Sequence, residues 1–151
     1  MIPVIRITGL REVRAKFARW PEKFNQAIKT TMDAGLHVLH ANVGKRGYPP
    51  PPTDSTYTRT HLLSNSLGVG GGNPDIYEVR DMGGGNFTGS FGTKVDYAPY
   101  VIGSKQSEQA WMHKGRWWTL PEDIVQDSID KIEKLFKAAV ETLADWINRN
   151  G

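Results

Sequence analysis

The sequence has no cysteine among its 151 residues. A disulfide framework is therefore excluded, and the chain suits a reducing compartment. Long hydrophobic runs are also missing: the first residues, Met1 to Arg6, reach a charge too soon for a signal peptide or a membrane span. We expect a soluble protein that is made in the cytoplasm.

The residues that are abundant indicate a compact core with long loops. Five Trp, five Tyr and five Phe supply much of the packing area, although hydrophobic residues make up only 38% of the chain. The 16 Gly and 9 Pro indicate a large loop fraction. The length fits one domain, which we assign to residues 1–151.

The charge is unevenly distributed along the chain, although the net value is only +3. Residues 1–75 carry ten Lys and Arg against five Asp and Glu, and the remainder carries nine against eleven. Such polarity can orient a subunit against a neighbour or an anionic partner. A solvated helix face is the simpler explanation of the basic half.

Apolar residues recur at steps of three and four near both ends of the chain. The first series runs from Leu10 to Val43 and predicts a long amphipathic helix. Pro21 interrupts this series, so we expect a kink or a break just before it, with Pro21 opening a second helical segment. A second series, from Val125 to Ile147, predicts a closing helix.

Three short runs rich in β-branched and aromatic residues predict strands, at Val4–Ile7, Ile76–Arg80 and Phe87–Val95. The glycine-rich segments 68–75 and 82–90 are expected to form hairpin loops, which implies an antiparallel sheet. The predicted fold class is therefore α+β. A long kinked N-terminal helix and a long C-terminal helix pack on a small antiparallel β-sheet with extended loops.

The stretch 92–103 is interpreted as a continuing strand, because its apolar residues follow an imperfect period of two. Pro99 has no amide hydrogen and cannot occupy a central ladder position. We therefore expect the strand to bend off the sheet at Ala98–Pro99. Leu67 and Val69 are expected to begin another extended segment.

No compact set of catalytic or metal-binding residues is evident. His37 and His40 are three apart on the first predicted helix, whereas zinc helices use a spacing of four with a Glu. His61 and His113 could join them only through the fold. Acid–base catalysis needs a close pair of tuned groups, and the sequence clusters no His with Asp and Glu. We therefore expect no enzyme activity, no cofactor and no metal site.

Two further stretches are candidates for contacts with partners. The loop predicted at 44–57 contains four consecutive prolines, which favour an extended polyproline II conformation. We interpret it as a stiff connector or an arm to a neighbouring subunit rather than a ligand for a proline-binding domain. The other stretch holds Trp111, Trp117 and Trp118. One or two of these should close the sheet over the helices, and any left exposed would anchor a partner.

Three stretches resemble elements of the neck or tail-completion proteins of long-tailed bacteriophages, a family that includes minor tail and head–tail joining proteins. Residues Thr60 to Leu67 are similar to the family's Thr-Gly-x-Leu-Arg-x-Ser-Ile element, with His61 and Ser64 in place of its Gly and Arg. Residues 92–103 resemble its Gly-Thr-x-Val-x-Tyr-Ala-Pro-Tyr-Val element. Residues 113–120 resemble a variant seen in prophage members. The order of helices and strands also agrees, so the likeness spans nearly the whole chain.

The resemblance implies a structural virion protein of a phage or prophage without enzymatic activity. It would be a ring-forming homo-oligomer at the head–tail junction, between a head-closure or connector protein and the tail terminator or tail tube protein. DNA would pass through the bore without sequence specificity. Ring subunits need two different contact faces. The residues that we expect at interfaces are Pro49, Pro50, Pro51, Pro52, Gly84, Gly85, Tyr97, Tyr100, Trp111, Trp117 and Trp118.

The basic residues of the first helical region could face the DNA in that bore. They are Arg11, Arg14, Lys16, Arg19 and Lys23. A nucleic-acid-binding module is the alternative function, although neither a set of stacking aromatics nor a groove-reading motif accompanies these residues. A small metal-dependent nuclease is a more remote alternative.

Overall fold

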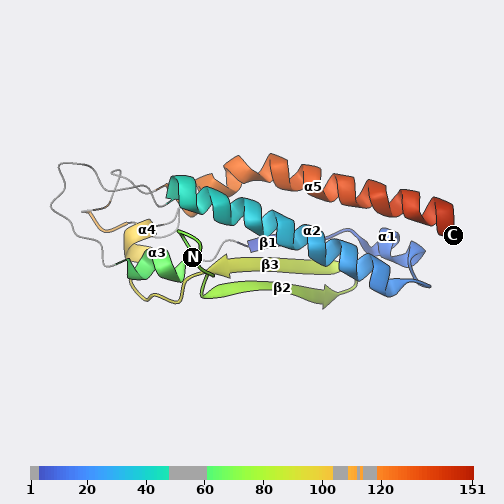
Figure 1. Ribbon diagram of the computed structural model, residues 1–151, viewed down its shortest axis with the longest axis horizontal. Helices are drawn as coiled ribbons and strands as arrows, with labels where there is room; N and C mark the ends of the chain where they lie inside the picture. The colour runs from blue at the N-terminus through green and yellow to red at the C-terminus, as the bar shows by residue number, and fades with distance from the viewer. Residues whose placement is uncertain (1–3, 48–60, 104–108, 112, 114–118) are drawn as a thin grey trace.

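The chain folds into two long helices, several short ones and one small sheet, in a computed structural model that describes residues 4–47, 61–103, 109–111, 113 and 119–151 (Figure 1). The elements in order are β1 (Val4–Ile7), α1 (Arg11–Lys16), α2 (Pro21–Asn42), the π-helical turn η1 (Val43–Gly47), α3 (Leu62–Ser66), β2 (Ile76–Gly83), β3 (Asn86–Gly92), α4 (Ala98–Ile102) and α5 (Pro121–Asn150). This arrangement confirms the predicted α+β class. Among the described helices, none has an apolar stretch long enough to cross a bilayer.

The break predicted before Pro21 is confirmed. α1 ends at Lys16, and α2 begins at Pro21, whose missing amide hydrogen is tolerated at the start of a helix. The turn η1 then continues the helical path to Gly47, so the loop predicted from residue 44 begins later. One face of α2 is buried, and its apolar residues are Phe24, Ile28, Met32, Leu36 and Leu39.

The sheet has the order β1-β3-β2, with β3 antiparallel to both neighbours. In this register Arg6 pairs with Thr88, and Thr88 pairs with Arg80, so the three side chains form one row across the sheet. β2 and β3 are joined through Gly84 and Gly85, whose φ angles of 64° and 82° suit a tight hairpin turn. The hairpin predicted within 82–90 is thereby confirmed.

Two glycines let α2 pack closely on its neighbours. A Cβ at Gly89 would lie 3.0 Å from Met32 Cε, so α2 crosses the central strand at that point. A Cβ at Gly35 would lie 3.0 Å from Ile5 Cδ1 and 3.5 Å from Ile132 Cγ2, so β1, α2 and α5 meet there. α5 runs along α2 on the side of the molecule away from β2 (Figure 1).

The hydrophobic core has two parts. One brings the end of α2 together with α3, α4 and the first half of α5, and its buried residues are Leu36, Leu39, Val43, Leu63, Leu67, Phe91, Ala98, Val101, Ile124 and Ile132. The other lies beneath α1 and the second half of α5, and its buried residues are Leu10, Phe17, Phe24, Ile28, Met32, Phe87 and Leu143. Each of these side chains other than Ala98 contributes roughly 1.5–3 kcal/mol on burial, so the two parts together hold the helices on the sheet.

The strand predicted over 92–103 is wrong. β3 ends at Gly92, which also shortens the strand predicted at Phe87–Val95, and the chain then forms the short helix α4. Pro99 lies in the first turn of α4, where no helical hydrogen bond is required of it. The proline that suggested a bend therefore helps to start a helix. α4 ends at Ile102, and the residue that follows, Gly103, has a φ angle of 72°.

The hairpin predicted at 68–75 and the extended segment from Leu67 are also wrong. This segment connects α3 to β2 rather than two strands. The Val69 amide donates a hydrogen bond to the Ser64 carbonyl over 2.9 Å, so the chain turns back directly after α3. A Cβ at Gly68 would meet the Gly72 carbonyl at 2.6 Å, which shows how tightly this turn is folded.

Candidate interaction surfaces

The sheet exposes two different strand edges. β3 is paired on both sides, whereas the outer edges of β1 and β2 have no partner strand within the described residues. An unpaired edge presents amide hydrogens and carbonyl oxygens that can pair with another chain. The two edges differ in length, because β1 has four residues and β2 has eight. One small sheet thus carries two distinct surfaces on opposite sides.

A groove of about 360 Å³ runs between β1 and α5. Its lining is mostly apolar and includes Ile5, Ile7, Val125, Ile129 and Phe136, with Arg6 and Glu133 adding charges. Ile129, which belongs to the apolar series of α5, is 37% exposed. The groove therefore leaves apolar surface of α5 in contact with solvent beside the open edge of β1.

The sheet face opposite α2 is polar. Arg6, Thr88 and Arg80 form its central row, and an Arg80–Glu78 ion pair with a 2.8 Å contact lies beside it. The Ser90 hydroxyl donates a hydrogen bond to Glu78 over 3.4 Å. A hollow of about 520 Å³ lies over these residues. This face suits contact with water, ions or a passing polyanion better than contact with a packed core.

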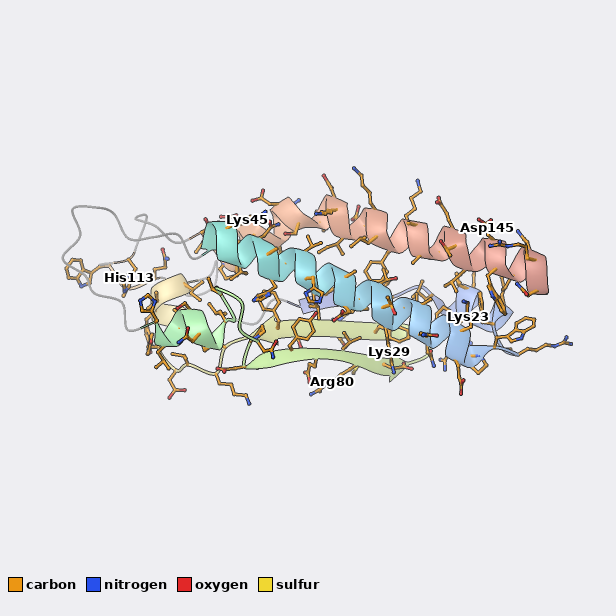
Figure 2. All side chains as sticks on the ribbon, viewed as in Figure 1. Lys23, Lys29, Lys45, Arg80, His113 and Asp145 are labelled. Atoms are coloured by element: carbon orange, nitrogen blue, oxygen red, sulfur yellow. The ribbon has the colours of Figure 1, made fainter. Side chains whose placement is uncertain are left out.

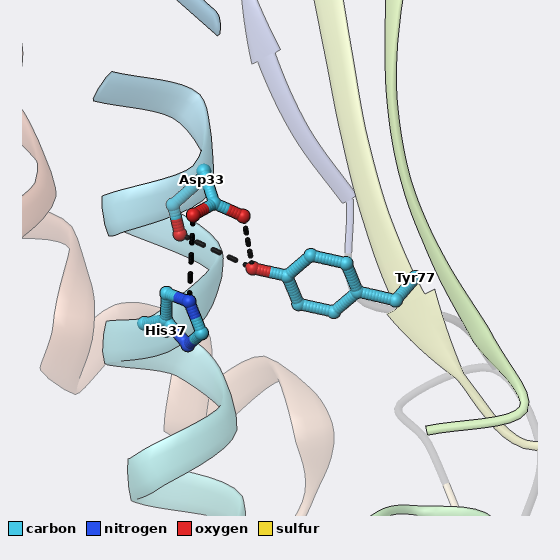
Figure 3. Close-up of polar contacts among 3 residues, drawn as sticks. All are labelled: Asp33, His37 and Tyr77. Carbon is cyan, nitrogen blue, oxygen red and sulfur yellow. Dashed lines mark hydrogen bonds and ion pairs between the residues drawn. The ribbon is translucent and has the colours of Figure 1, made fainter. Parts of the chain in front are cut away.

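A polar cluster ties α2 to β2 (Figure 3). The Tyr77 hydroxyl donates a 2.6 Å hydrogen bond to the Asp33 carboxylate, and His37 Nε2 lies 3.4 Å from the other carboxylate oxygen. Burial of the phenol, and then its hydrogen bond and proximity to Asp33, raise the pKa of Tyr77 well above its usual value of 10.0. The phenol therefore stays protonated and acts as a donor that fastens the helix to the sheet.

Two of the stretches that resemble phage neck elements, the described part of Thr60 to Leu67 and residues 92–103, contact each other at one end of the molecule, and His113 of the third is linked to them through Ala110. Ser66 Oγ, at the end of α3, lies 2.6 Å from Thr93 Oγ1, which precedes α4. The Ala110 amide donates to the Tyr100 carbonyl, and the His113 amide donates to the Ala110 carbonyl, both over 2.8 Å. Figure 2 shows His113 beside α4 at this end. Segments that are far apart in sequence thus form one unit.

Exposed aromatic side chains lie on this motif-bearing end. Tyr97 and Tyr100 of the α4 region are 39% and 65% exposed, and Trp111 is 79% exposed. Exposed large apolar residues that gather in one place are typical of interaction sites. Among the other expected interface residues, Gly84 and Gly85 form the β2–β3 turn. Pro49–Pro52, Trp117 and Trp118 lie outside the described residues.

The predicted DNA-facing basic residues are brought to the opposite end of the molecule, where Figure 2 shows Lys23. Arg11, Arg14 and Lys16 lie on α1, Arg19 follows it, and Lys23 lies on α2. The Lys23 ammonium lies 5.4 Å from the ring centre of Trp146, which is a cation–π distance. Lys23 is therefore engaged with α5 as well as accessible to solvent.

The histidines that were considered as metal ligands have separate roles. His37 faces Asp33, whereas His40 Nε2 lies 2.8 Å from the Leu67 carbonyl, to which it donates and thereby links α2 to the end of α3. Within the part of the chain that the structure describes, no group of three or more His, Asp or Glu side chains is placed to hold a metal ion.

Sequence reasoning missed the groove and the unpaired edges. The edges follow from the strand order β1-β3-β2, and the groove depends on how α5 lies relative to β1. Only Ile129 carries a local signal, as an apolar residue at the margin of its helix stripe. Comparison of the chain with protein families, curated proteins and solved structures found no match.

Proposed function

We propose that the chain is a structural subunit of a phage or prophage virion that forms a ring in the neck and joins the head connector to the tail. The observation that carries the proposal is the pair of unlike open edges on opposite sides of one sheet. A closed ring needs a heterologous, head-to-tail contact between two different surfaces of the same subunit. The two edges offer such surfaces.

The arrangement of the family-like stretches supports the same function. The first two of these stretches are brought together around α3 and α4, where Leu63, Leu67, Ala98 and Val101 share one part of the core. Tyr97, Tyr100 and Trp111 then project from that end. A ring of such subunits would present a circle of aromatic side chains at one rim. This rim suits docking to a head-closure protein or to the tail terminator or tube protein, because aromatic residues are enriched at the centres of protein interfaces.

The proposal assigns no catalysis to this protein. Its partners would be other copies of itself, the neighbouring neck and tail proteins, and DNA that passes through the bore without sequence specificity. The subunit would be made in the host cytoplasm and would act in the virion.

Deletion of the gene from its phage tests the proposal. We expect DNA-filled heads and complete tails to accumulate separately, and addition of the purified protein to join them into infectious particles. Variants of the sheet edges should fail in the same addition assay. Normal virions from the deletion strain would contradict the proposal.

A further inference from the structure

We infer that neighbouring subunits pair the β1 edge of one copy with the β2 edge of the next, so that their sheets continue around the ring. The inference rests on the proposed ring but goes further, because it names the interface and its register. Both strands show a free edge within the described residues, and the groove between β1 and α5 lies next to the first of them.

The widths of the two layers explain the groove. Two helices that are each about 10 Å wide span about 20 Å, whereas three strands that are about 4.8 Å apart span only about 14 Å. α5 therefore extends past β1, and its residues Val125, Ile129 and Phe136 overhang the open edge. A fourth strand beside β1 would lie beneath α5 and cover this apolar surface. We therefore infer that a strand of a second copy fills the groove between β1 and α5.

The strand direction is compatible with a ring of identical subunits. β1 and β2 are both antiparallel to β3, so they are parallel to each other. Rotation about an axis along the strands preserves their direction. The edge of β1 would therefore meet β2 of the neighbouring subunit as a parallel pair, which needs no rearrangement of either sheet.

Charge and hydrophobicity select one register for this pair. In an unshifted register, each row of paired residues in one sheet would continue in line into the same row of the next subunit. Arg6 would then lie beside Arg80 of the neighbouring subunit, and Ile7 would lie beside Asp81 of the neighbouring subunit. Both contacts are unfavourable.

If β2 of the neighbouring subunit is shifted by two residues along β1, each side chain stays on the same face of the sheet and both contacts improve. Arg6 then lies beside Glu78 of the neighbouring subunit, with opposite charges on the polar face. Ile5 and Ile7 lie beside Tyr77 and Val79 of the neighbouring subunit, and the apolar row continues on the helix side. We therefore assign the register Ile5–Tyr77, Arg6–Glu78 and Ile7–Val79 between adjacent copies.

The same layer widths set the direction of curvature. Because the helix layer is wider than the sheet, a closed ring places the helices outside and the sheet inside. The polar face with Thr88, Ser90 and the Arg6–Glu78 pairs would then line the bore. Arg6, Arg80 and Glu78 of each subunit give this lining two positive charges and one negative charge, with hydroxyls between them. Its net charge is small and positive, so a polyanion is attracted weakly and can pass without being held.

Engineered disulfides test the register. Because the chain has no native cysteine, only the introduced residues can form disulfides. Residues 6 and 78 of one subunit are separated by β3 and by an offset of two residues along the strands. Their Cα atoms are therefore about 12 Å apart, too far for a disulfide, which needs roughly 4.4–6.8 Å. Across the proposed interface they would be about 4.8 Å apart. We expect the oxidised R6C/E78C protein to give a ladder of covalent multimers on a non-reducing gel, and a reductant to collapse it to monomer.

Matched variants make the result specific. R6C/R80C reports the unshifted register and should cross-link at least about five-fold less, because a two-residue slip moves the Cα atoms about 6.6 Å along the strand. R6C alone should give no dimer, since the contact joins two different edges. Dimers of R6C alone would indicate a symmetric β1–β1 contact and overturn the inference.

Rings of R6C/E78C seen by electron microscopy without a ladder would overturn the inference and leave the proposed function standing. A chain that stays monomeric by native mass spectrometry at every concentration would defeat both.

Discussion

At the scale of single residues, the backbone of the β2–β3 turn is the most constrained feature. Gly84 and Gly85 both have positive φ, but their surroundings differ. A Cβ at Gly85 would lie 3.1 Å from backbone atoms of Leu10 and Arg11, whereas a Cβ at Gly84 would meet only the Asn86 side chain, at 3.6 Å. The β2–β3 turn therefore packs directly against the backbone that connects β1 to α1.

We expect Gly85→Ala to lower the free energy of unfolding by about 2–4 kcal/mol, from the left-handed backbone and the contact with rigid backbone atoms. Gly84→Ala is the matched control and should cost about 1 kcal/mol, because only the backbone strain applies. Urea unfolding monitored by circular dichroism measures both. Equal losses would show that the Gly85 contact with Leu10 and Arg11 is not close in solution.

We expect the free energy of unfolding to fall at alkaline pH because of Tyr77. Its raised pKa means that the folded state keeps a proton that the unfolded state loses above pH 10.0, the usual pKa of the phenol. The stabilisation is complete below that pH and declines as the pH rises further. Tyr77→Phe should be less stable at neutral pH by about 1 kcal/mol, through loss of the Asp33 hydrogen bond. It should also show a shallower decline in melting temperature above pH 10.0 than the wild type does. Parallel declines in the two proteins would exclude Tyr77 as the cause.

At the scale of elements, the helices could be predicted because apolar residues recur about every 3.6 positions within each helical segment, a pattern that needs no knowledge of the rest of the chain. The stripe from Phe24 to Leu39 is buried where the period places it. The series from Val125 to Ile147 lies on the predicted helix α5, but only Ile132 and Leu143 of it are buried, and Ile129 is exposed. The stretch 92–103 could not be predicted in this way. Its weak alternation resembled a strand, but Ala98 and Val101 are three apart and are buried together in a single helical turn. The turn is defined by its contacts with α3, which lies about thirty residues earlier in the chain.

The candidate surfaces were predictable only in part for the same reason. Tyr97, Tyr100 and Trp111 were expected at interfaces on residue type alone, and all three are exposed. The groove arises because α5 lies beside β1, and the open edges arise from the strand order β1-β3-β2. No local pattern in the sequence encodes either arrangement. Arg6 and Glu78 acquire a shared role only when a second copy is considered.

The overhanging part of α5 provides a prediction at this scale. Ile129→Asp should leave the monomer folded, because the side chain is already 37% exposed, but it should weaken self-association by placing a carboxylate in the groove. Ala144→Asp adds the same charge at an exposed position of α5 outside the groove lining and serves as the control. Sedimentation velocity distinguishes the two. Equal association of both variants would show that the groove is not buried in the assembly.

At the scale of the whole molecule, the two ends have different characters. The aromatic end around α4 carries the family-like stretches, and the basic end around α1 carries Arg11 to Lys23. Such polarity suits a subunit that is held between two different partners along one axis.

The aromatic end should be needed for joining but not for folding. Tyr100→Ala and Trp111→Ala should change the free energy of unfolding by less than about 0.5 kcal/mol, since both side chains are largely exposed. They should nevertheless reduce head–tail joining at least about ten-fold if they lie at the centre of an interface. Met82→Ala, which removes a similarly exposed apolar side chain from β2, is the control and should join normally. Full joining by both aromatic variants would rule out this end as the docking rim.

The central claim is that this fold is the unit of a closed ring, and the mass of the purified protein in native mass spectrometry tests it most directly. The account predicts one dominant species at an integral multiple of the 16.9 kDa chain, seen as rings by electron microscopy. R6E should lower its abundance, and the double variant R6E/E78R should restore it. A single species at 16.9 kDa at all concentrations would contradict the account.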